Sequence, residues 1–165
     1  YRSSRTSLMV WGAIGWDWKS PLVFLEKEEG RKGICSKAYL NQVLNNVIFP
    51  HWAEMTEDER SKFIFMEDGS KVHKGHARLP RLNSWIRTFE WPPSSPDLNP
   101  IEKVWRWMKN QITALPKVPT TIEELKGHIQ KLWDEVDPVY FRRYTERLTC
   151  KLEDVIKLKG LSTVH

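Results

Sequence analysis

Hydrophobic and polar positions in the first half of the chain change repeatedly between strand-like and helix-like spacing. The apolar run at residues 8–16 predicts a buried strand, and residues 22–25, after a short turn, predict its hairpin partner. Residues 36–52 repeat apolar positions at helical spacing, and Pro50 is expected to shorten or kink the end of that helix. The run FIFM, residues 63–66, is apolar on both faces and predicts a central strand covered on both sides.

The second half of the chain is dominated by helical spacing. A helix is expected near residues 78–87, followed by a short strand at 88–91. Three further helices are expected at 100–113, from about 121 to 136, and at 139–159. This order of elements predicts an α/β domain with a central mixed β-sheet flanked by helices. The core is expected at about 8–113, with C-terminal helices at about 121–160, in one partial domain spanning 1–165.

Composition and charge narrow the range of partners. With 165 residues, 40% hydrophobic and 28% charged, the chain fits one globular domain with a real core. The net charge of +5 favours a polyanionic partner. Two distant cysteines argue against a zinc site or a disulfide framework, and no run is long enough to span a membrane. We therefore expect an intracellular protein without a membrane segment or signal peptide, and the start at Tyr1 rather than Met is consistent with a fragment or a trimmed chain.

Two acidic residues stand at positions where an ordinary structural role competes with chemistry. Asp68 follows the FIFM strand directly, where functional residues gather in open α/β sheets, but Asp-Gly is also a good turn pair. Alternation along this strand points Asp68 the same way as Ile64, and Glu67 the opposite way. Glu102 lies three residues after Asn99, a good N-cap, so a capping box alone accounts for it. The local pattern favours the structural role for both.

Taken together, the two acids have a further interpretation. Carboxylates at a strand end and in the first turn of a helix can share divalent cations such as Mg²⁺, which prefer oxygen ligands. Two such ions can activate a water or hydroxyl and stabilise the leaving oxygen in phosphodiester displacement. The spacing alone does not decide between this interpretation and the structural one.

The segment 71–87 favours a partner that carries phosphates. It contains no acid, two histidines (His73 and His76), and five cationic residues: Lys71, Lys74, Arg78, Arg81 and Arg87. Such a run is either an ordinary solvated face or a surface that binds a nucleic-acid backbone. Several tryptophans flank loops and could stack on bases, although half-buried packing is the favoured expectation for them: Trp16, Trp18, Trp85 and Trp91.

Three segments resemble one family. SPDLNPIEKVWRWMK is similar to the third-carboxylate motif of Tc1/mariner-type DDE transposases, FIFMEDGSKVH to their second-carboxylate motif, and LMVWGAIGWDWKSPLVFLE to their central hairpin. The resemblance implies an RNase H-like fold. It also implies metal-dependent cleavage of DNA at transposon ends, with Mg²⁺ or Mn²⁺, and joining of those ends to a target.

Position by position, the resemblance assigns the second carboxylate to Asp68 and the third to Glu102, both as metal ligands and catalytic groups. It matches His73 to the histidine that follows the second Asp, and Asp97 to an acid that is not a metal ligand. The basic residues Lys71, His73, Lys74, Arg78 and Arg81 are the expected DNA contacts. The family's first Asp lies on a strand before the hairpin, and residues 1–7 contain no acid, so we expect the isolated chain to cleave little or no DNA.

The resemblance also implies partners and a location. Transposon-end and target DNA are the expected partners, a homodimer is a candidate in the synaptic complex, and the location is the nucleus if the source is eukaryotic. Two competing hypotheses remain open at this point: a relic or co-opted fragment that binds DNA without catalysis, and an unrelated α/β protein in which Glu102 is only a cap.

Overall fold

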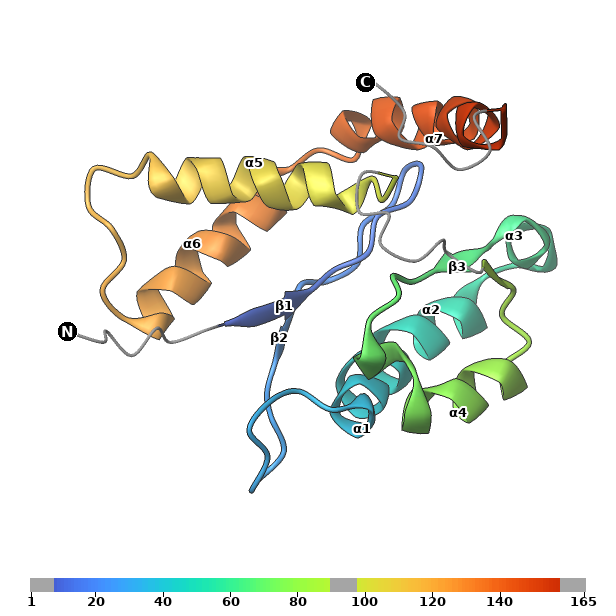
Figure 1. The fold of residues 1–165 in the computed structure, drawn as a ribbon, viewed down its shortest axis with the longest axis horizontal. Helices are drawn as coiled ribbons and strands as arrows, with labels where there is room; N and C mark the ends of the chain where they lie inside the picture. Colours follow the sequence, from blue (N-terminus) through green and yellow to red (C-terminus); the bar gives the residue numbers. More distant parts are fainter. Residues whose placement is uncertain (1–7, 90–97, 158–165) are drawn as a thin grey trace. The chain divides into compact units, whose positions relative to one another are not determined.

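The computed structural model describes residues 8–89 and 98–157, which form two compact units (Figure 1). The first unit contains the described residues up to 11 and those from 23 to 89, and the second contains residues 12–22 and 98–157. Each unit has its own packed interior. The prediction of one partial domain across the whole chain stays a prediction.

Among the described residues of the first unit, four short strands form two pairs. β1 (Met9–Trp11) pairs antiparallel with β2 (Val23–Leu25), with Val10 opposite Phe24, which confirms the predicted hairpin (Figure 1). β3 (Phe65–Met66) pairs in parallel with β4 (Thr88–Phe89). The first strand is shorter than the apolar run that predicted it. Beyond Trp11 its ladder is reduced to one isolated bridge between Ile14 and Lys19.

The helix predicted at residues 36–52 is present but is not uniform. It comprises α1 (Ser36–Tyr39), a π-helical stretch η1 (Leu40–Ile48), and α2 (Phe49–Glu54). The wider π turns precede Pro50, which has no N–H to give to a helical carbonyl. Pro50 therefore lies inside the helical segment without ending it, and the expectation of a shortened end is wrong.

The FIFM strand is only partly as predicted. Helix α3 (Glu57–Lys62), which starts with a capping box between Thr56 and Glu59, ends just before it. Only two of its residues pair as a strand, and Ile64 is 54% exposed, so this stretch is not covered on both faces in the described part of the chain. The alternation itself is correct, because Phe65 is buried whereas Ile64 and Asp68 are exposed.

The basic segment is less regular than predicted. Two 3₁₀ turns, η2 (Lys71–His73) and η3 (Gly75–Ala77), lead into a short helix α4 (Arg78–Asn83). The helix expected to run to residue 87 thus ends four residues early. The reason is Trp85, whose backbone has a φ of 61° and cannot continue a right-handed helix.

The interior of the first unit lies between its helical segment and its strands. Tyr39, Val43, Leu44 and Ile48, at helical spacing, are essentially inaccessible to solvent. They pack with buried residues from the strands and the basic segment: Leu25, Phe65, Ala77 and Ile86. Burial of this apolar face, rather than helix propensity, is the main source of the helix's stability.

Three helices make up most of the second unit: α5 (Ile101–Thr113), α6 (Ile122–Glu135) and α7 (Val139–Lys157). They confirm the predicted helices. The capping box of α6 is formed by Thr121 and Glu124, with hydroxyl and carboxylate both bonded as the pattern indicated. Trp105 stacks on Trp133 with ring centroids 5.3 Å apart, and Trp133 is 1% exposed. This tryptophan pair joins α5 to α6.

The loop at residues 12–22 is held to these helices by polar contacts. The Lys19 ammonium donates to the backbone oxygens of Trp133, Asp134 and Val136, at 2.6, 2.9 and 2.8 Å. The Trp133 indole N–H donates to the Ser20 carbonyl at 2.9 Å. Asp17, in the turn of this loop, pairs with Arg142 of α7.

Some predictions fall outside the described residues. These are the acid-free stretch 1–7, the residues 90–91 of the expected last strand, the loop that contains Asp97, and the end of the last helix beyond residue 157. Among the described helices, none combines the length and the apolar character that a membrane span requires.

Candidate functional site

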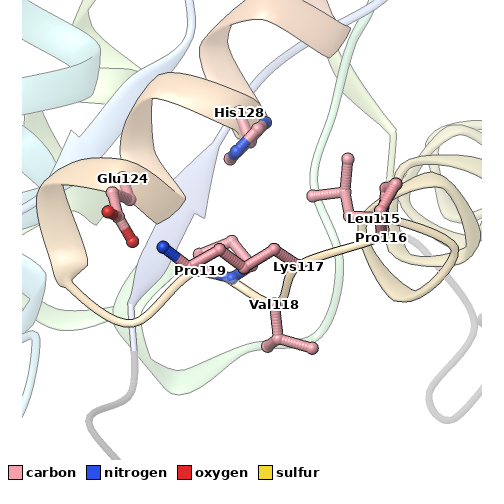
Figure 2. Close-up of a pocket in the computed structure, with 7 residues that line it drawn as sticks. All are labelled: Leu115, Pro116, Lys117, Val118, Pro119, Glu124 and His128. Carbon is pink, nitrogen blue, oxygen red and sulfur yellow. The ribbon is translucent and has the colours of Figure 1, made fainter.

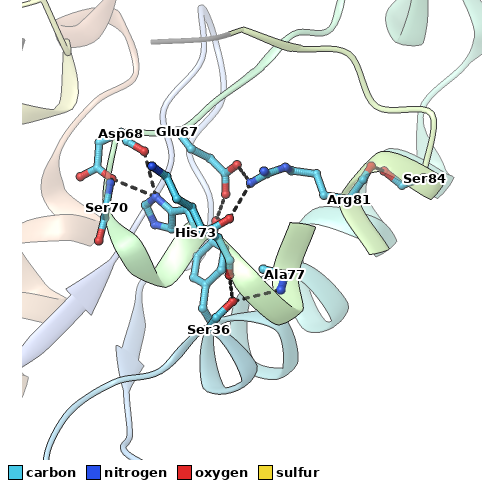
Figure 3. Close-up of polar contacts among 10 residues, drawn as sticks. Ser36, Glu67, Asp68, Ser70, His73, Ala77, Arg81 and Ser84 are labelled. Atoms are coloured by element: carbon cyan, nitrogen blue, oxygen red, sulfur yellow. Dashed lines mark hydrogen bonds and ion pairs between the residues drawn. The ribbon is translucent and has the colours of Figure 1, made fainter. Parts of the chain in front are cut away.

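Asp68 lies just past β3, where the chain turns toward the basic segment (Figure 3). Its Oδ1 accepts a hydrogen bond from the backbone N–H of Ser70 at 2.9 Å, which is the turn role that the sequence favoured. The same oxygen lies 2.9 Å from Nδ1 of His73. The Asp68 side chain is nevertheless 54% exposed, so the carboxylate faces solvent while its rotamer is fixed by two neighbours.

His73 is positioned from two sides. Its ring packs against Tyr39 with centroids 4.5 Å apart, and its side chain is only 15% exposed. Its Nδ1 is directed at Asp68, also lying 3.3 Å from the Asp68 backbone oxygen. The structure therefore brings together the two residues that the motif resemblance paired, and it makes His73 a support for Asp68 rather than an open surface group.

Glu67, adjacent to Asp68, belongs to a buried polar network that the sequence interpretation did not identify (Figure 3). Its carboxylate accepts a hydrogen bond from the Tyr39 hydroxyl at 2.7 Å and pairs with the Arg81 guanidinium. Burial raises the pKa of the Tyr39 phenol, and the nearby Glu67 carboxylate raises it further. The available signal was strand alternation, since Glu67 shares the inward face of Phe65 and a buried acid requires a cation.

Arg81 completes this network. Its Nη1 also donates to the backbone oxygen of His73 at 3.1 Å, and its side chain is 15% exposed. Arg81 thus connects α4, the end of β3 and the turn that carries His73. Among the lysines and arginines expected to contact DNA, Arg81 is engaged by a described carboxylate, whereas Lys71, Lys74 and Arg78 are exposed.

Glu102 lies in the first turn of α5, in the second unit. Its backbone N–H donates to the Asn99 carbonyl at 3.1 Å, and the Asn99 side chain accepts a longer bond of 3.4 Å from Ile101. The reciprocal capping-box bond expected from Glu102 is not formed, and no described residue pairs with its carboxylate. No ion pair joins the Glu102 carboxylate to Arg106 or Lys109 of the same helix in the described part of the chain. The local structural role therefore does not occupy this carboxylate.

The chemistry of these two acids fits a hard divalent cation. Asp68 keeps an oxygen free of described partners, and the half-buried Glu102 carboxylate is unpaired among described residues. Oxygen ligands of this kind suit Mg²⁺ and Mn²⁺. No group of three or more potential metal ligands is clustered within the described residues. The two carboxylates belong to different units.

A second feature of the surface proves less informative. A shallow depression in the second unit is lined by residues 115–119 with Glu124 and His128 of α6 (Figure 2). Its one carboxylate, Glu124, accepts bonds from Thr120 and Thr121 in the capping box, and these bonds lower the pKa of Glu124. Because the Glu124 carboxylate is used by the helix cap, we assign no function to this depression.

Comparison with solved structures defines the class of fold. The catalytic domain of the Mos1 mariner transposase matches with a TM-score of 0.74 at 17% identity, covering 95% of this chain and 76% of that one. A structure of the same domain with raltegravir and Mn matches with a TM-score of 0.75 at 16% identity, covering 95% of this chain and 78% of that one. The chain therefore has the RNase H-like fold of these domains, as predicted.

Sequence comparison then gives the family. Residues 3–126 match the DDE superfamily endonuclease family, so the chain belongs to it, as a Tc1/mariner DDE transposase domain. The Tcb2 transposase of Caenorhabditis briggsae is 24% identical over 164 residues, which cover 96% of this chain and 55% of that protein. The Tc3 transposase of Caenorhabditis elegans is 24% identical over 160 residues, which cover 93% of this chain and 44% of that protein. The chain thus spans about half the length of these relatives.

Proposed function

We propose that this chain supplies two of the three carboxylates, Asp68 and Glu102, of a metal-dependent DNA strand-cleaving and strand-transferring domain. The observation that carries the proposal is the state of Glu102. It lies in the motif that resembles the family's third-carboxylate motif, yet neither the helix cap nor a described cation uses its side chain. Family membership makes transposon-end and target DNA the substrate class, and makes nuclear action the expectation for a eukaryotic source.

In this proposal the residues of the chain have three different roles: metal binding, positioning of a carboxylate, and phosphate contact. Asp68 and Glu102 hold Mg²⁺ or Mn²⁺, which when bound supplies an activated oxygen nucleophile and stabilises the leaving oxygen. His73 keeps Asp68 in one rotamer, because its own ring is fixed against Tyr39. The exposed cations Lys71, Lys74 and Arg78 neutralise DNA phosphates beside Asp68. A homodimer in a synaptic complex is part of the same proposal, and the relevant finding is a matching Mos1 paired-end complex.

Shared metal binding is the test of this proposal. Mn²⁺ affinity of the 165-residue chain is measured by electron paramagnetic resonance for the wild type, Asp68→Asn, Glu102→Gln and the double variant. If both acids hold one ion, each single change weakens binding and the double change costs less than the sum. Asp58→Asn, an exposed acid of α3, is the control. Strictly additive effects, or effects no larger than the control's, would overturn the shared site.

Activity of the isolated chain is a separate question. None of its acids matches the family's first carboxylate, so we expect the 165-residue chain to nick supercoiled plasmid little or not at all in Mg²⁺ or Mn²⁺. Nicking that Glu102→Ala abolishes would refute this expectation while supporting the metal site.

The second candidate function is DNA binding without catalysis, by a relic or co-opted domain. The feature that favours it is the basic segment, whose exposed cations do not depend on any metal. Salt-sensitive DNA binding together with an absence of coupled Mn²⁺ binding would select this function over the first.

A further inference from the structure

Trp85 is the most exposed large apolar side chain in the described part of the chain. It is 88% exposed, whereas half-buried packing was the expectation from sequence. Its backbone lies in the left-handed region, with a φ of 61°, which is unfavourable for a bulky side chain. Such an outlier persists only where the surrounding structure imposes it, and outliers of this kind cluster at functional positions.

The surroundings of Trp85 hold it firmly. On one side the Ser84 hydroxyl donates to the Arg81 carbonyl at 2.6 Å, which closes the end of α4. On the other side Ile86 is 6% exposed in the core, and the Arg87 carbonyl accepts a 2.8 Å bond from Phe65. Both neighbours of Trp85 are therefore anchored, and the indole ring is directed outward from a rigid base.

Three residues of α4, which precedes Trp85 in the sequence, are also exposed. Leu82 precedes it by three residues and is 55% exposed, and Leu79, one turn earlier, is 67% exposed. Arg78, four residues before Leu82 on α4, is exposed on the same side of the helix. We refer to these four residues, Arg78, Leu79, Leu82 and Trp85, as the Trp85 surface. It comprises an exposed aromatic ring, two exposed apolar side chains and an exposed cation, all between residues 78 and 85.

The charge around this surface indicates what covers it. Between residues 69 and 89 the chain contains five cationic residues and no acid. Lys71, Lys74 and Arg78 are exposed, while Arg81 is engaged with Glu67. A segment with cations only suits a polyanion, and an exposed aromatic ring suits a polyanion whose own planar rings are accessible. Single-stranded nucleic acid has both properties, whereas the bases of an intact duplex are stacked on one another.

We propose that the Trp85 surface binds an unpaired stretch of DNA, with a base stacked on the Trp85 indole and the adjoining phosphates contacted by Arg78 and Lys74. This proposal rests on the proposed function, because it takes DNA as the substrate class. It goes beyond that function by assigning a role to a residue outside the carboxylate site, and by distinguishing unpaired strands from duplex.

The experiment compares two DNA probes by fluorescence anisotropy at low salt. One is a labelled thymidine strand of about 15 nucleotides, enough to cover one site, and the other is a blunt duplex of equal length. Trp85→Gly is the main variant, since glycine accepts a positive φ without cost and the fold is retained. We expect it to weaken binding of the single strand by about tenfold, which is within the range measured for removal of one stacked aromatic ring. Binding of the duplex should change by less than about twofold, because its bases do not reach the indole.

Two further variants complete the test. Trp85→Phe keeps an aromatic face and should retain most of the single-strand affinity. Trp16→Ala removes another exposed tryptophan, 53% exposed and outside the basic segment, and should change neither affinity. A thymidine strand carrying 5-iododeoxyuridine should form a photocrosslink at Trp85, located by mass spectrometry of the digested chain.

The outcomes separate the two proposals. Equal binding of the single strand by wild type and Trp85→Gly would overturn the Trp85 surface and leave the carboxylate site untouched. Self-association of the wild type that Trp85→Gly abolishes would also overturn it, since a second copy would then cover the ring. Failure of coupled Mn²⁺ binding with a preserved Trp85 effect would overturn only the metal site. A wild type that binds neither probe at low salt would count against both.

Discussion

At the scale of single residues, the region around Asp68 is organised by ion pairs of unequal burial. Asp68 pairs with His73 at an exposed position, whereas Glu67, its chain neighbour, pairs with Arg81 at a site where the two side chains are 10% and 15% exposed. Alternation along the strand separates them, so one acid supports the fold and the other stays accessible. Neighbouring carboxylates with opposite surroundings thus take different roles.

The Glu67–Arg81 pair is expected to be important for stability. Arg81→Met leaves the Glu67 carboxylate buried without its cation, and breaking a buried pair in this way costs about 3–5 kcal/mol of unfolding free energy. Lys62→Met is the matched control, because Lys62 and Asp58 are 72% and 75% exposed and such pairs contribute less than about 1 kcal/mol. Urea unfolding of both variants checks the difference, and equal losses would contradict the assignment.

Because the Tyr39 phenol is buried, we expect the unfolding free energy to fall at alkaline pH. Burial and the Glu67 carboxylate raise the pKa of its phenol in the folded chain, whereas an unfolded tyrosine loses its proton near pH 10. Above about pH 10 the unfolded state binds fewer protons, so unfolding free energy falls, by up to about 1.4 kcal/mol per pH unit. Below that pH this contribution is constant. Urea unfolding between about pH 8 and 11 should show a steeper decline for wild type than for Tyr39→Phe; parallel curves would contradict it.

At the scale of elements, glycine positions in the loop 12–22 differ in what they can tolerate. A Cβ on Gly12 would lie 2.7 and 2.9 Å from two ring carbons of Trp133, which is 1% exposed and cannot withdraw. We expect Gly12→Ala to cost about 1–3 kcal/mol of unfolding free energy through overpacking.

Gly15 provides the control for this prediction. A Cβ there would meet its nearest neighbour, in Trp18, at 3.8 Å, an ordinary contact. Gly15→Ala should therefore change the urea midpoint little, by less than about 0.5 kcal/mol in free energy. A Gly12→Ala variant as stable as Gly15→Ala would show that Trp133 can move.

Much of the element order could be predicted from hydrophobic periodicity, and particular residues show where this fails. The hairpin, the long first helix and helices α5 to α7 are found because their apolar faces are regular. The early end of α4 depends on Trp85, whose left-handed backbone has no sequence signature comparable to glycine. The Glu67 network was missed because its cation, Arg81, is 14 residues away and reads as part of a basic surface.

For the candidate site, the sequence identified the two carboxylates but not all of their surroundings. The motifs singled out Asp68 and Glu102 as candidates, and their role stays a prediction. Strand alternation correctly placed Asp68 on the same side as Ile64 and opposite Glu67, but not the exposure of that side. Local pattern could not show that the carboxylate of Glu102 is free of a described partner, because the same spacing normally produces a capping box. That box does form in α6, where Thr121 is the N-cap and Glu124 the third helical residue. In α5 the N-cap is Pro100, so Glu102 is only the second helical residue.

At the scale of the whole molecule, the excess of positive charge and the basic segment predict salt-dependent DNA binding. If Lys71, Lys74 and Arg78 contact phosphates, the logarithm of the association constant should fall linearly with the logarithm of salt concentration. Replacing all three by glutamine should reduce the slope by about 0.9 for each phosphate that is no longer neutralised.

The controls for this prediction are the two carboxylates. Asp68→Ala and Glu102→Ala should leave the salt slope in metal-free buffer unchanged, because neither contributes a cation. Arg81→Gln is expected to lower the stability of the fold and to change the salt slope little, because its guanidinium already pairs with Glu67. An unaltered salt slope for the triple variant would show that the DNA contacts lie outside the basic segment.

The three carbonyl bonds of Lys19 have a consequence for chemical reactivity. An ammonium has three N–H donors, and here each has an acceptor at the end of α6, so the nitrogen is enclosed much as a chelated ion would be. In the folded chain Lys19 should be acylated by amine-directed reagents far more slowly than the exposed Lys32, and at a comparable rate once urea is added. The labelling of this one lysine would then report when the loop 12–22 separates from its helix.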